Sequence, residues 1–105
     1  MSSGELVRHR LGPVSALPVG EGRTFAVGTE QVAVYRLRDG ALRAVSAVCP
    51  HSGGPLADGT VDAEKVVCPL HNFSFAFEDG RCLNGDFALT VFAVSEEDGD
   101  VVVEL

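Results

Sequence analysis

Short apolar segments separated by glycine-containing turns dominate the sequence. The clearest segment holds Phe73, Phe75 and Phe77, which alternate with two small residues and would therefore share one face of a strand. Patterns of this kind predict strands over residues 23–27, 31–37, 41–48, 65–67, 74–77, 81–83, 88–94 and 101–105. No window predicts an amphipathic helix, because 12 glycines and 5 prolines are spread along the chain.

Asp-Gly pairs between apolar segments predict antiparallel hairpins. They occur at Asp39-Gly40, Asp79-Gly80 and Asp98-Gly99. In the segment before the first pair, Val32 and Val34 are expected on one face, and Tyr35 is expected to face outward or to pack at an edge. We therefore expect an all-β fold of many short strands in a sandwich or small barrel, with residues 1–105 forming a single domain.

Composition and charge narrow the function. Apolar residues make up 46% of the chain and mean hydropathy is +0.20, which excludes a disordered chain, and no apolar run is long enough to span a membrane. The net charge of −7 argues against nucleic acid as a partner. Most of the acids follow residue 50, so they form either solvated turns or an acidic surface that attracts a basic partner.

The cysteine count and the N-terminus indicate where the chain works. The first twelve residues contain no apolar segment of the kind found in signal peptides, so we expect a cytoplasmic protein. Three cysteines in a reducing compartment argue against a disulfide framework and favour metal or redox chemistry. Cys82 is expected to be a small buried hydrophobe within a strand.

Two short stretches each combine one cysteine with one histidine. Cys49 and His51 are followed, after sixteen residues, by Cys68 and His71 in a C-x-x-H arrangement. Four soft or borderline ligands in two short loops predict a metal site. Zinc would take all four ligands in one tetrahedron, whereas a Rieske centre would place two cysteines on one iron and two histidines on the other. Ligand identity alone leaves both metals open.

The residues around these ligands favour the iron–sulfur alternative. Pro50 and Pro69 would stiffen the two loops, and Gly53 and Gly54 would let backbone N–H groups approach bridging sulfides. The second ligand pair lacks the helical H-x₃₋₅-H spacing common in zinc fingers. Residues 44–57 and 66–77 contain no Lys, Arg, Asp or Glu, which predicts either a buried loop pair or an apolar tip where a partner docks.

With these motifs the chain resembles the Rieske ferredoxin-like proteins over nearly its whole length. The string Cys-Pro-His-Ser-Gly-Gly-Pro-Leu at 49–56, followed by Cys-Pro-Leu-His at 68–71, is similar to that of the cluster-binding small subunits of assimilatory NAD(P)H nitrite reductases. Residues 36–40 and 75–80 resemble the strands and turns that flank the two loops in those subunits. Ferredoxin components of aromatic-ring dioxygenases carry the same ligand pattern.

The resemblance implies a small all-β body of three sheets, from which two cluster-binding loops project. It implies one Rieske-type [2Fe–2S] cluster per chain, with Cys49 and Cys68 on the buried iron and His51 and His71 on the outer iron. The expected role is electron transfer to a large catalytic redox subunit of a nitrite reductase. The alternatives are a ferredoxin serving the reductase and oxygenase of a ring-hydroxylating system, and a structural zinc module for protein contacts.

Two departures from high-potential respiratory Rieske proteins bear on the redox potential. Gly54 and Leu70 stand where those proteins have two further cysteines joined as a disulfide. Phe73 and Phe75 stand where those proteins have a serine and a tyrosine that donate hydrogen bonds to the cluster. Because such donors stabilise the reduced state, their loss predicts a potential at the low end of the Rieske range.

Overall fold

The computed structural model describes residues 7–49, 55–70 and 72–105. Strands account for nearly all regular structure in these residues, and none of their helices is long and apolar enough to cross a membrane. The elements are β1 (Arg8–Pro13), β2 (Glu21–Val27), β3 (Glu30–Arg36), β4 (Leu42–Ser46), β5 (Thr60–Val61), β6 (Lys65–Val67), β7 (Ser74–Ala76), β8 (Val91–Glu97), β9 (Asp100–Glu104) and the 3₁₀ turns η1 (Val14–Ala16) and η2 (Leu56–Asp58).

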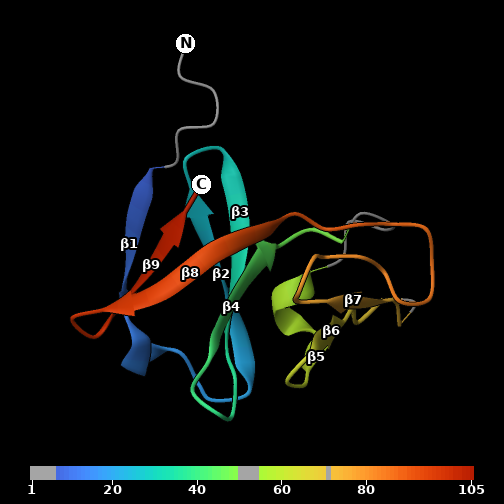
Figure 1. Cartoon of the computed structure of the whole chain (residues 1–105), viewed down its shortest axis with the longest axis horizontal. Coiled ribbons are helices and arrows are strands. Elements are labelled where there is room, and N and C mark those ends of the chain that lie inside the picture. Colours follow the sequence, from blue (N-terminus) through green and yellow to red (C-terminus); the bar gives the residue numbers. More distant parts are fainter. Residues whose placement is uncertain (1–6, 50–54, 71) are drawn as a thin grey trace.

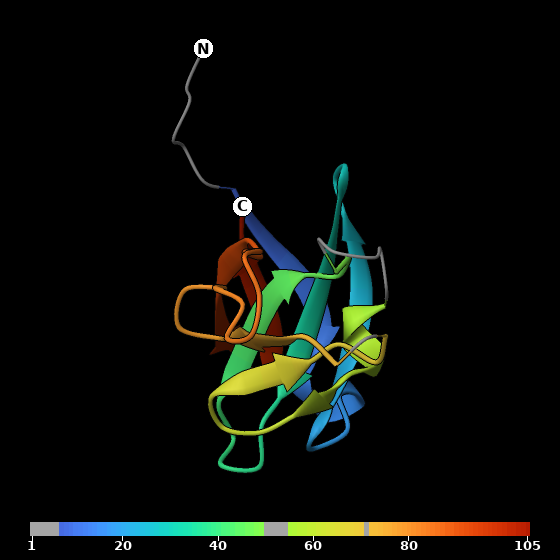
Figure 2. The same cartoon turned by 90° about the vertical axis from the view of Figure 1, so that its right-hand side faces the viewer.

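The strands form two sheets, and every pairing between named strands is antiparallel. The larger sheet has the order β1-β9-β8-β4-β3-β2, and the smaller has the order β5-β6-β7. Figures 1 and 2 show the smaller sheet on one side of the larger, in front of β3 and β4 when seen from that side. The all-β prediction is confirmed. Two of the three sheets implied by the resemblance are joined into one by pairing of β4 with β8.

Strand β3 is buried on both faces, which decides where Tyr35 lies. Val32 and Val34 face one core with residues of β9, whereas Ala33 and Tyr35 face a second core beneath the smaller sheet. Tyr35 has 0% exposure, so the expectation of an outward-facing or edge residue is wrong. The reason is that the smaller sheet covers a face that strand alternation alone would leave to solvent.

The Asp-Gly hairpin predictions are confirmed. Asp39-Gly40 separates β3 from β4, and Asp98-Gly99 joins β8 to β9. Asp98 and Gly99 both have positive φ angles, 53° and 83°, as a two-residue turn of type I′ requires. After Asp79-Gly80 the chain returns alongside β7, where Cys82 forms an isolated antiparallel bridge with Phe75.

Several strands differ from the predicted ones. The segment predicted at 81–83 forms isolated bridges instead of a strand, and β8 begins at Val91, three residues later than predicted. Strands β1 and β5 were not predicted, because β1 is rich in charged residues and β5 has two residues. Both exist through pairing with distant strands, a tertiary contribution that local propensity does not contain.

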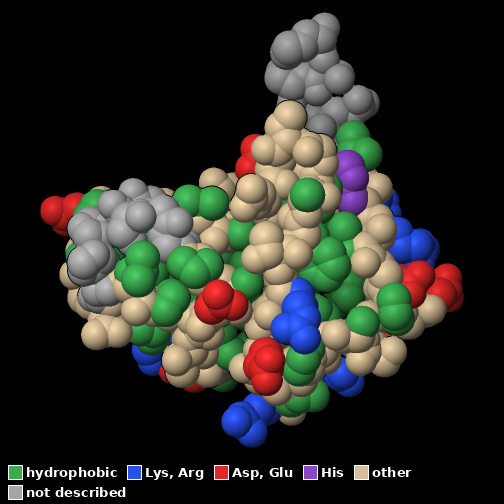
Figure 3. All heavy atoms as spheres, turned by 180° about the vertical axis from the view of Figure 1, so that it is seen from behind, with side chains coloured by type: hydrophobic (Ala, Val, Ile, Leu, Met, Phe, Trp, Pro, Cys, Tyr) green, Lys and Arg blue, Asp and Glu red, His purple; other side chains and the backbone are tan. Residues whose placement is uncertain are grey.

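Charged side chains of opposite sign meet at the edge formed by β1 and β9. Arg8 contacts Glu97 and Glu104, and Arg10 lies 3.0 Å from Asp100. Figure 3 shows acidic and basic side chains next to one another at this edge. Exposed pairs of this kind each contribute about 1 kcal/mol or less. They also neutralise part of the negative charge of the C-terminal half, which weakens the argument for one continuous acidic surface.

Candidate metal centre

The first predicted ligand loop leaves the larger sheet just after β4. Its two ends are held together, because the Leu56 N–H donates to the Ala47 carbonyl at 3.0 Å and Val48 bridges to Pro55. Cys49 lies at the beginning of the loop and is 1% exposed. The remaining predicted features of this loop lie outside the described residues: Pro50, His51, Gly53 and Gly54.

The second predicted ligand loop lies between β6 and β7 of the smaller sheet. Cys68 follows β6 directly, has 0% exposure, and donates its N–H to the Phe73 carbonyl at 2.7 Å. This bond joins the two ends of the second loop, at Cys68 and Phe73. Pro69 and Leu70 are exposed, whereas His71 lies outside the described residues.

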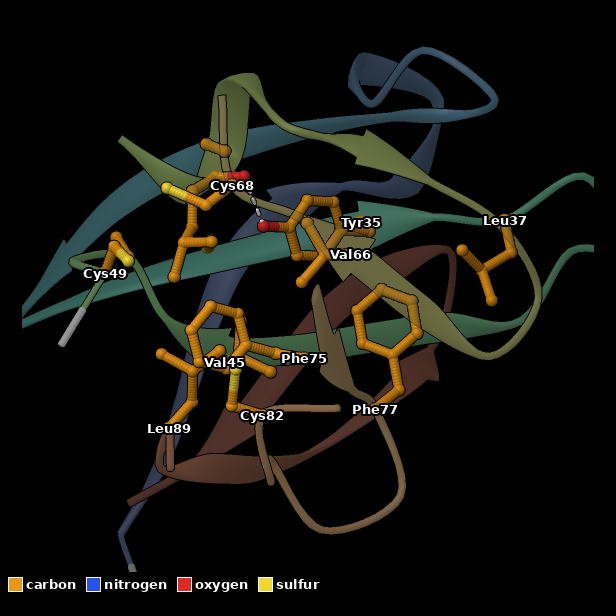
Figure 4. Close-up of a cluster of buried hydrophobic side chains, with 14 residues drawn as sticks. Tyr35, Leu37, Val45, Cys49, Val66, Cys68, Phe75, Phe77, Cys82 and Leu89 are labelled. Atoms are coloured by element: carbon orange, nitrogen blue, oxygen red, sulfur yellow. Dashed lines mark hydrogen bonds between the residues drawn. The ribbon is translucent and has the colours of Figure 1, made fainter. Parts of the chain in front are cut away.

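The two loops bring Cys49 and Cys68 to the same end of one core. Figure 4 shows both thiols at that end, from different sheets, with Cys82 farther away beyond Phe75. The Cys82 thiol donates to Asn84 Oδ1 at 3.5 Å and the residue is buried, which confirms its expected place in the core. Of the four predicted ligands, Cys49 and Cys68 belong to the described residues. Within the described residues no cluster of three or more potential metal ligands occurs.

The donor set fits an iron–sulfur cluster on its chemistry. Cysteine sulfur is the ligand that such clusters prefer, and the two buried thiols come from stretches without charged side chains. The core around them includes Leu56, Val66 and Phe75, each with 0% exposure, so water is excluded from the cysteine side of the site. An apolar shell of this kind influences the reduction potential of the metal.

The described parts of the loops also expose apolar side chains beside the two cysteines. Val48 and Leu70 are both 44% exposed, and Pro55 and Pro69 are exposed as well. These four residues, here called the apolar tip, lie in stretches without charged side chains. A surface of this composition can exclude water from a contact with another protein.

Tyr35 anchors the end of the first ligand loop, a contact that the sequence did not predict. Its hydroxyl donates to the Leu56 carbonyl at 2.6 Å, which ties β3 to the turn that ends the first loop. Burial raises the pKa of its phenol well above the ordinary value, and the nearby Asp58 and Cys68 raise it further, so the group stays protonated as a donor. The ring also packs against Phe77, with centroids 5.4 Å apart.

A glycine in β2 makes room for this tyrosine. A Cβ atom at Gly22 would lie 2.5 Å from the Tyr35 ring and 3.0 Å from the Ala57 carbonyl, so no side chain fits there. The signal for a buried tyrosine was present in the sequence, since Ala33, Tyr35 and Leu37 form a second apolar face of the same strand. Reading both faces of that strand as apolar would have placed Tyr35 correctly.

Replacing Tyr35 by phenylalanine is expected to lower the free energy of unfolding by about 1–2 kcal/mol, because the buried Leu56 carbonyl loses its side-chain donor. Urea unfolding followed by circular dichroism measures the change. If the slope of the unfolding free energy against urea concentration is unchanged, the substitution has left the compactness of the folded and unfolded states the same. Stability equal to that of the unsubstituted protein would contradict the assigned bond.

Comparisons with known proteins agree with this architecture. A family model described as the Rieske [2Fe–2S] domain matches residues 8–95. A crystal structure described as the NADH-dependent nitrite reductase small subunit of Mycobacterium tuberculosis is similar with a TM-score of 0.89 and 28% identity, covering 96% of both chains. The 3-phenylpropionate/cinnamic acid dioxygenase ferredoxin subunit of Escherichia coli K12 is 30% identical over 96 residues, or 89% of each chain.

The relatives also include much longer proteins. Cholesterol 7-desaturase nvd of Xenopus laevis is 40% identical over 73 residues, which cover 69% of this chain and 16% of the relative. The chain spans 16%, 19% and 52% of the length of the first three curated relatives that it matches. What the matches share is therefore the cluster domain. On the family match, the two buried cysteines and the antiparallel fold, the chain belongs to the Rieske [2Fe–2S] domain family of electron-transfer proteins.

Proposed function

We propose that this chain is the electron-transfer subunit of an NAD(P)H-dependent nitrite reductase. The observation that carries the proposal is the likeness to the small subunit from M. tuberculosis, which extends over 96% of both chains with a TM-score of 0.89. The loop sequences at 49–56 and 68–71 support the same assignment through their resemblance to such subunits. A large catalytic subunit would then supply the centres that oxidise the nicotinamide and reduce nitrite.

The proposed ligands are Cys49 and Cys68 for the inner iron and His51 and His71 for the outer iron. The burial of both cysteines supports the inner assignment. When bound, the [2Fe–2S] group supplies a site that accepts and releases one electron. The chain itself holds this group with its loop residues, excludes water with the core around Phe75, and presents the apolar tip to a partner.

The test is reconstitution with a large subunit of the nitrite reductase class. Purified large subunit is assayed for nitrite reduction with NADH or NADPH, alone and with this chain added. Leu70→Asp, in the apolar tip, is expected to weaken the stimulation by about tenfold, because a partner must then desolvate a charge. Val19→Asp is the matched control, since Val19 is 52% exposed and lies outside both loops.

Two results would contradict the proposal. One is a large subunit whose activity does not depend on this chain. The other is stimulation that Val19→Asp lowers as much as Leu70→Asp, because the apolar tip would then have no special role. The first result would remove the nitrite reductase assignment, whereas the second would remove only the role of the apolar tip, and both would leave the family membership intact.

A second candidate function is that of a ferredoxin in a ring-hydroxylating dioxygenase system. It is favoured by the 30% identity with the E. coli dioxygenase ferredoxin subunit over 89% of each chain. In that case the chain would accept electrons from a flavoprotein reductase and pass them to an oxygenase. The same assay with those two components separates the candidates, and the neighbouring genes should encode either a nitrite reductase or oxygenase subunits.

The midpoint potential is expected at the low end of the Rieske range of about −150 to +300 mV, and below about +100 mV. The physical reason is that Phe73 and Phe75 carry no hydroxyl to donate to cluster sulfur. The Phe73 ring packs edge-on against Phe87 at 5.2 Å, and Phe75 has 0% exposure in the core. A redox titration followed by visible absorbance measures the potential, and a midpoint above about +100 mV would contradict the argument.

A further inference from the structure

The segment between β7 and β8 contributes a side chain that holds the second ligand loop. Figure 1 shows this segment returning alongside β7 before it enters β8. The Leu83 N–H donates to the Ser74 carbonyl at 2.8 Å, which places the next residue, Asn84, beside the end of the loop. Asn84 is exposed, so its hydrogen bonds are made at the surface and not as part of the core.

The Asn84 amide bonds to the backbone on both sides of Phe73. Its Oδ1 accepts the Ser74 N–H at 2.9 Å, and its Nδ2 donates to the Asn72 carbonyl at 3.2 Å. The same Oδ1 also accepts the Cys82 thiol at 3.5 Å. Because Oδ1 faces two donors, the amide orientation is determined, and the NH₂ group is directed to the Asn72 carbonyl.

The carbonyl held in this way belongs to a turn that needs support. Asn72 has a φ of 57°, in the left-handed region that residues other than glycine adopt at some cost. The neighbouring Phe73 carbonyl accepts the Cys68 N–H, so the loop closes next to the same turn. Asn84 therefore holds the backbone where the loop reverses direction.

A glycine next to Asn84 allows this close approach. A Cβ atom at Gly85 would lie 3.1 Å from atoms of both the Phe73 and the Phe87 rings. Those rings pack edge to face at 5.2 Å, and together they join the segment to the loop by an apolar contact. Asn84 and this ring pair thus hold the same stretch of backbone by two independent interactions.

We propose that Asn84 is a positioning residue for the cluster, which fixes the Asn72 carbonyl and with it the conformation of the ligand loop that begins at Cys68. The inference rests on the proposed ligand set, in which His71 directly precedes Asn72 in the sequence. A ligand loop that is held by the protein loses its metal group more slowly, because fewer loop conformations are open to it.

The discriminating variant is Asn84→Asp, which has the same shape and keeps an acceptor for the Ser74 N–H. It removes the donor to Asn72 and places a carboxylate oxygen against the carbonyl oxygen. Asn84→Ala removes both bonds to the backbone and the bond from the Cys82 thiol. Asp86→Asn is the matched control, because Asp86 is exposed in the same segment and its side chain makes no hydrogen bond or ion pair within the described residues.

The first measurement is the rate at which visible absorbance decays in excess chelator, together with the EPR spectrum of the reduced protein and the thermal midpoint. Loss of the cluster is expected to be about five- to thirtyfold faster in Asn84→Asp and Asn84→Ala, and unchanged in Asp86→Asn. The EPR spectrum of Asn84→Asp should shift, while its thermal midpoint stays close to that of the unsubstituted protein.

Decay rates within twofold of the unsubstituted protein would overturn the proposal. So would faster decay that is matched by a lower thermal midpoint with an unchanged EPR spectrum, because Asn84 would then act on overall stability alone.

A second measurement does not depend on the cluster. Hydrogen exchange of the protein as purified, read by mass spectrometry in peptides covering 68–76, should be about five- to thirtyfold faster in Asn84→Asp than in Asp86→Asn. Equal exchange in the two variants would overturn the proposal that Asn84 fixes the Asn72 carbonyl. An error in the proposed ligand set can be distinguished from an error in the role of Asn84. If the protein holds no cluster, the unsubstituted protein is colourless before any variant is made.

Discussion

Cys68→Ser is expected to abolish the visible absorbance of the protein and to remove most of its iron and acid-labile sulfide. A serine hydroxyl is a much harder and less acidic donor than a thiol, so it does not replace a thiolate on iron. Cys68 has 0% exposure at the end of β6, so no solvent ligand can easily take its place. Cys49→Ser is expected to have the same effect. Absorbance, iron and sulfide are measured in protein purified without oxygen.

The chain offers a matched control for this substitution. Cys82→Ser also replaces a buried thiol, and the new hydroxyl can still donate to Asn84 Oδ1, so the cluster should be retained. His51→Ala and His71→Ala test the two ligands that lie outside the described residues, and each should lose the cluster spectrum. A full spectrum in Cys68→Ser would contradict the ligand set, and one zinc ion in place of iron would favour the zinc module.

Phe75→Ala is expected to lower the free energy of unfolding by about 3–5 kcal/mol, a large part of the total of about 5–15 kcal/mol for a domain. The Phe75 ring has 0% exposure and lies in the same core as Cys49 and Cys68. Its removal leaves a cavity next to the cysteine side of the site, because neighbouring side chains collapse only in part. Urea unfolding measures the change, and visible absorbance reports the cluster content.

Phe25→Ala provides the comparison within the same chain. Phe25 is half-buried in β2 and packs against the other core, so its loss should cost less, about 1–2 kcal/mol, and should leave the cluster in place. If the two variants lost equal stability, or if Phe75→Ala lost less than about 1 kcal/mol, the assignment of Phe75 to the core of the site would be contradicted.

Both ligand loops are anchored by contacts that involve no proposed ligand side chain. The first ends at a turn held by the Tyr35 hydroxyl, and the second is held at Asn72 by the Asn84 amide. Anchors of this kind restrict the backbone that they hold, so less conformational entropy is expected to be lost when a metal group binds. Their substitution is expected to change cluster retention more gradually than substitution of a cysteine.

The sequence by itself determined the features that depend on neighbouring residues. Asp98-Gly99 forms a two-residue turn of a type that requires positive φ angles at both positions, which Asp and Gly tolerate. The alternation of Phe73, Phe75 and Phe77 places the last two in the core. The pairing of one cysteine with one histidine in each of two stretches likewise indicated a metal site, because ligand type and spacing are local properties.

Only the tertiary structure decided the features that join distant parts of the chain. Tyr35 is buried because a second sheet covers its face, and its hydroxyl bonds to a carbonyl 21 residues away. The polar strand β1 exists because it pairs with β9 at the other end of the chain. Asn84 holds the second loop because a returning segment places it beside Asn72, twelve residues earlier. Such contacts depend on how strands stack and return, and hydrophobic periodicity carries no information about which distant residues will meet.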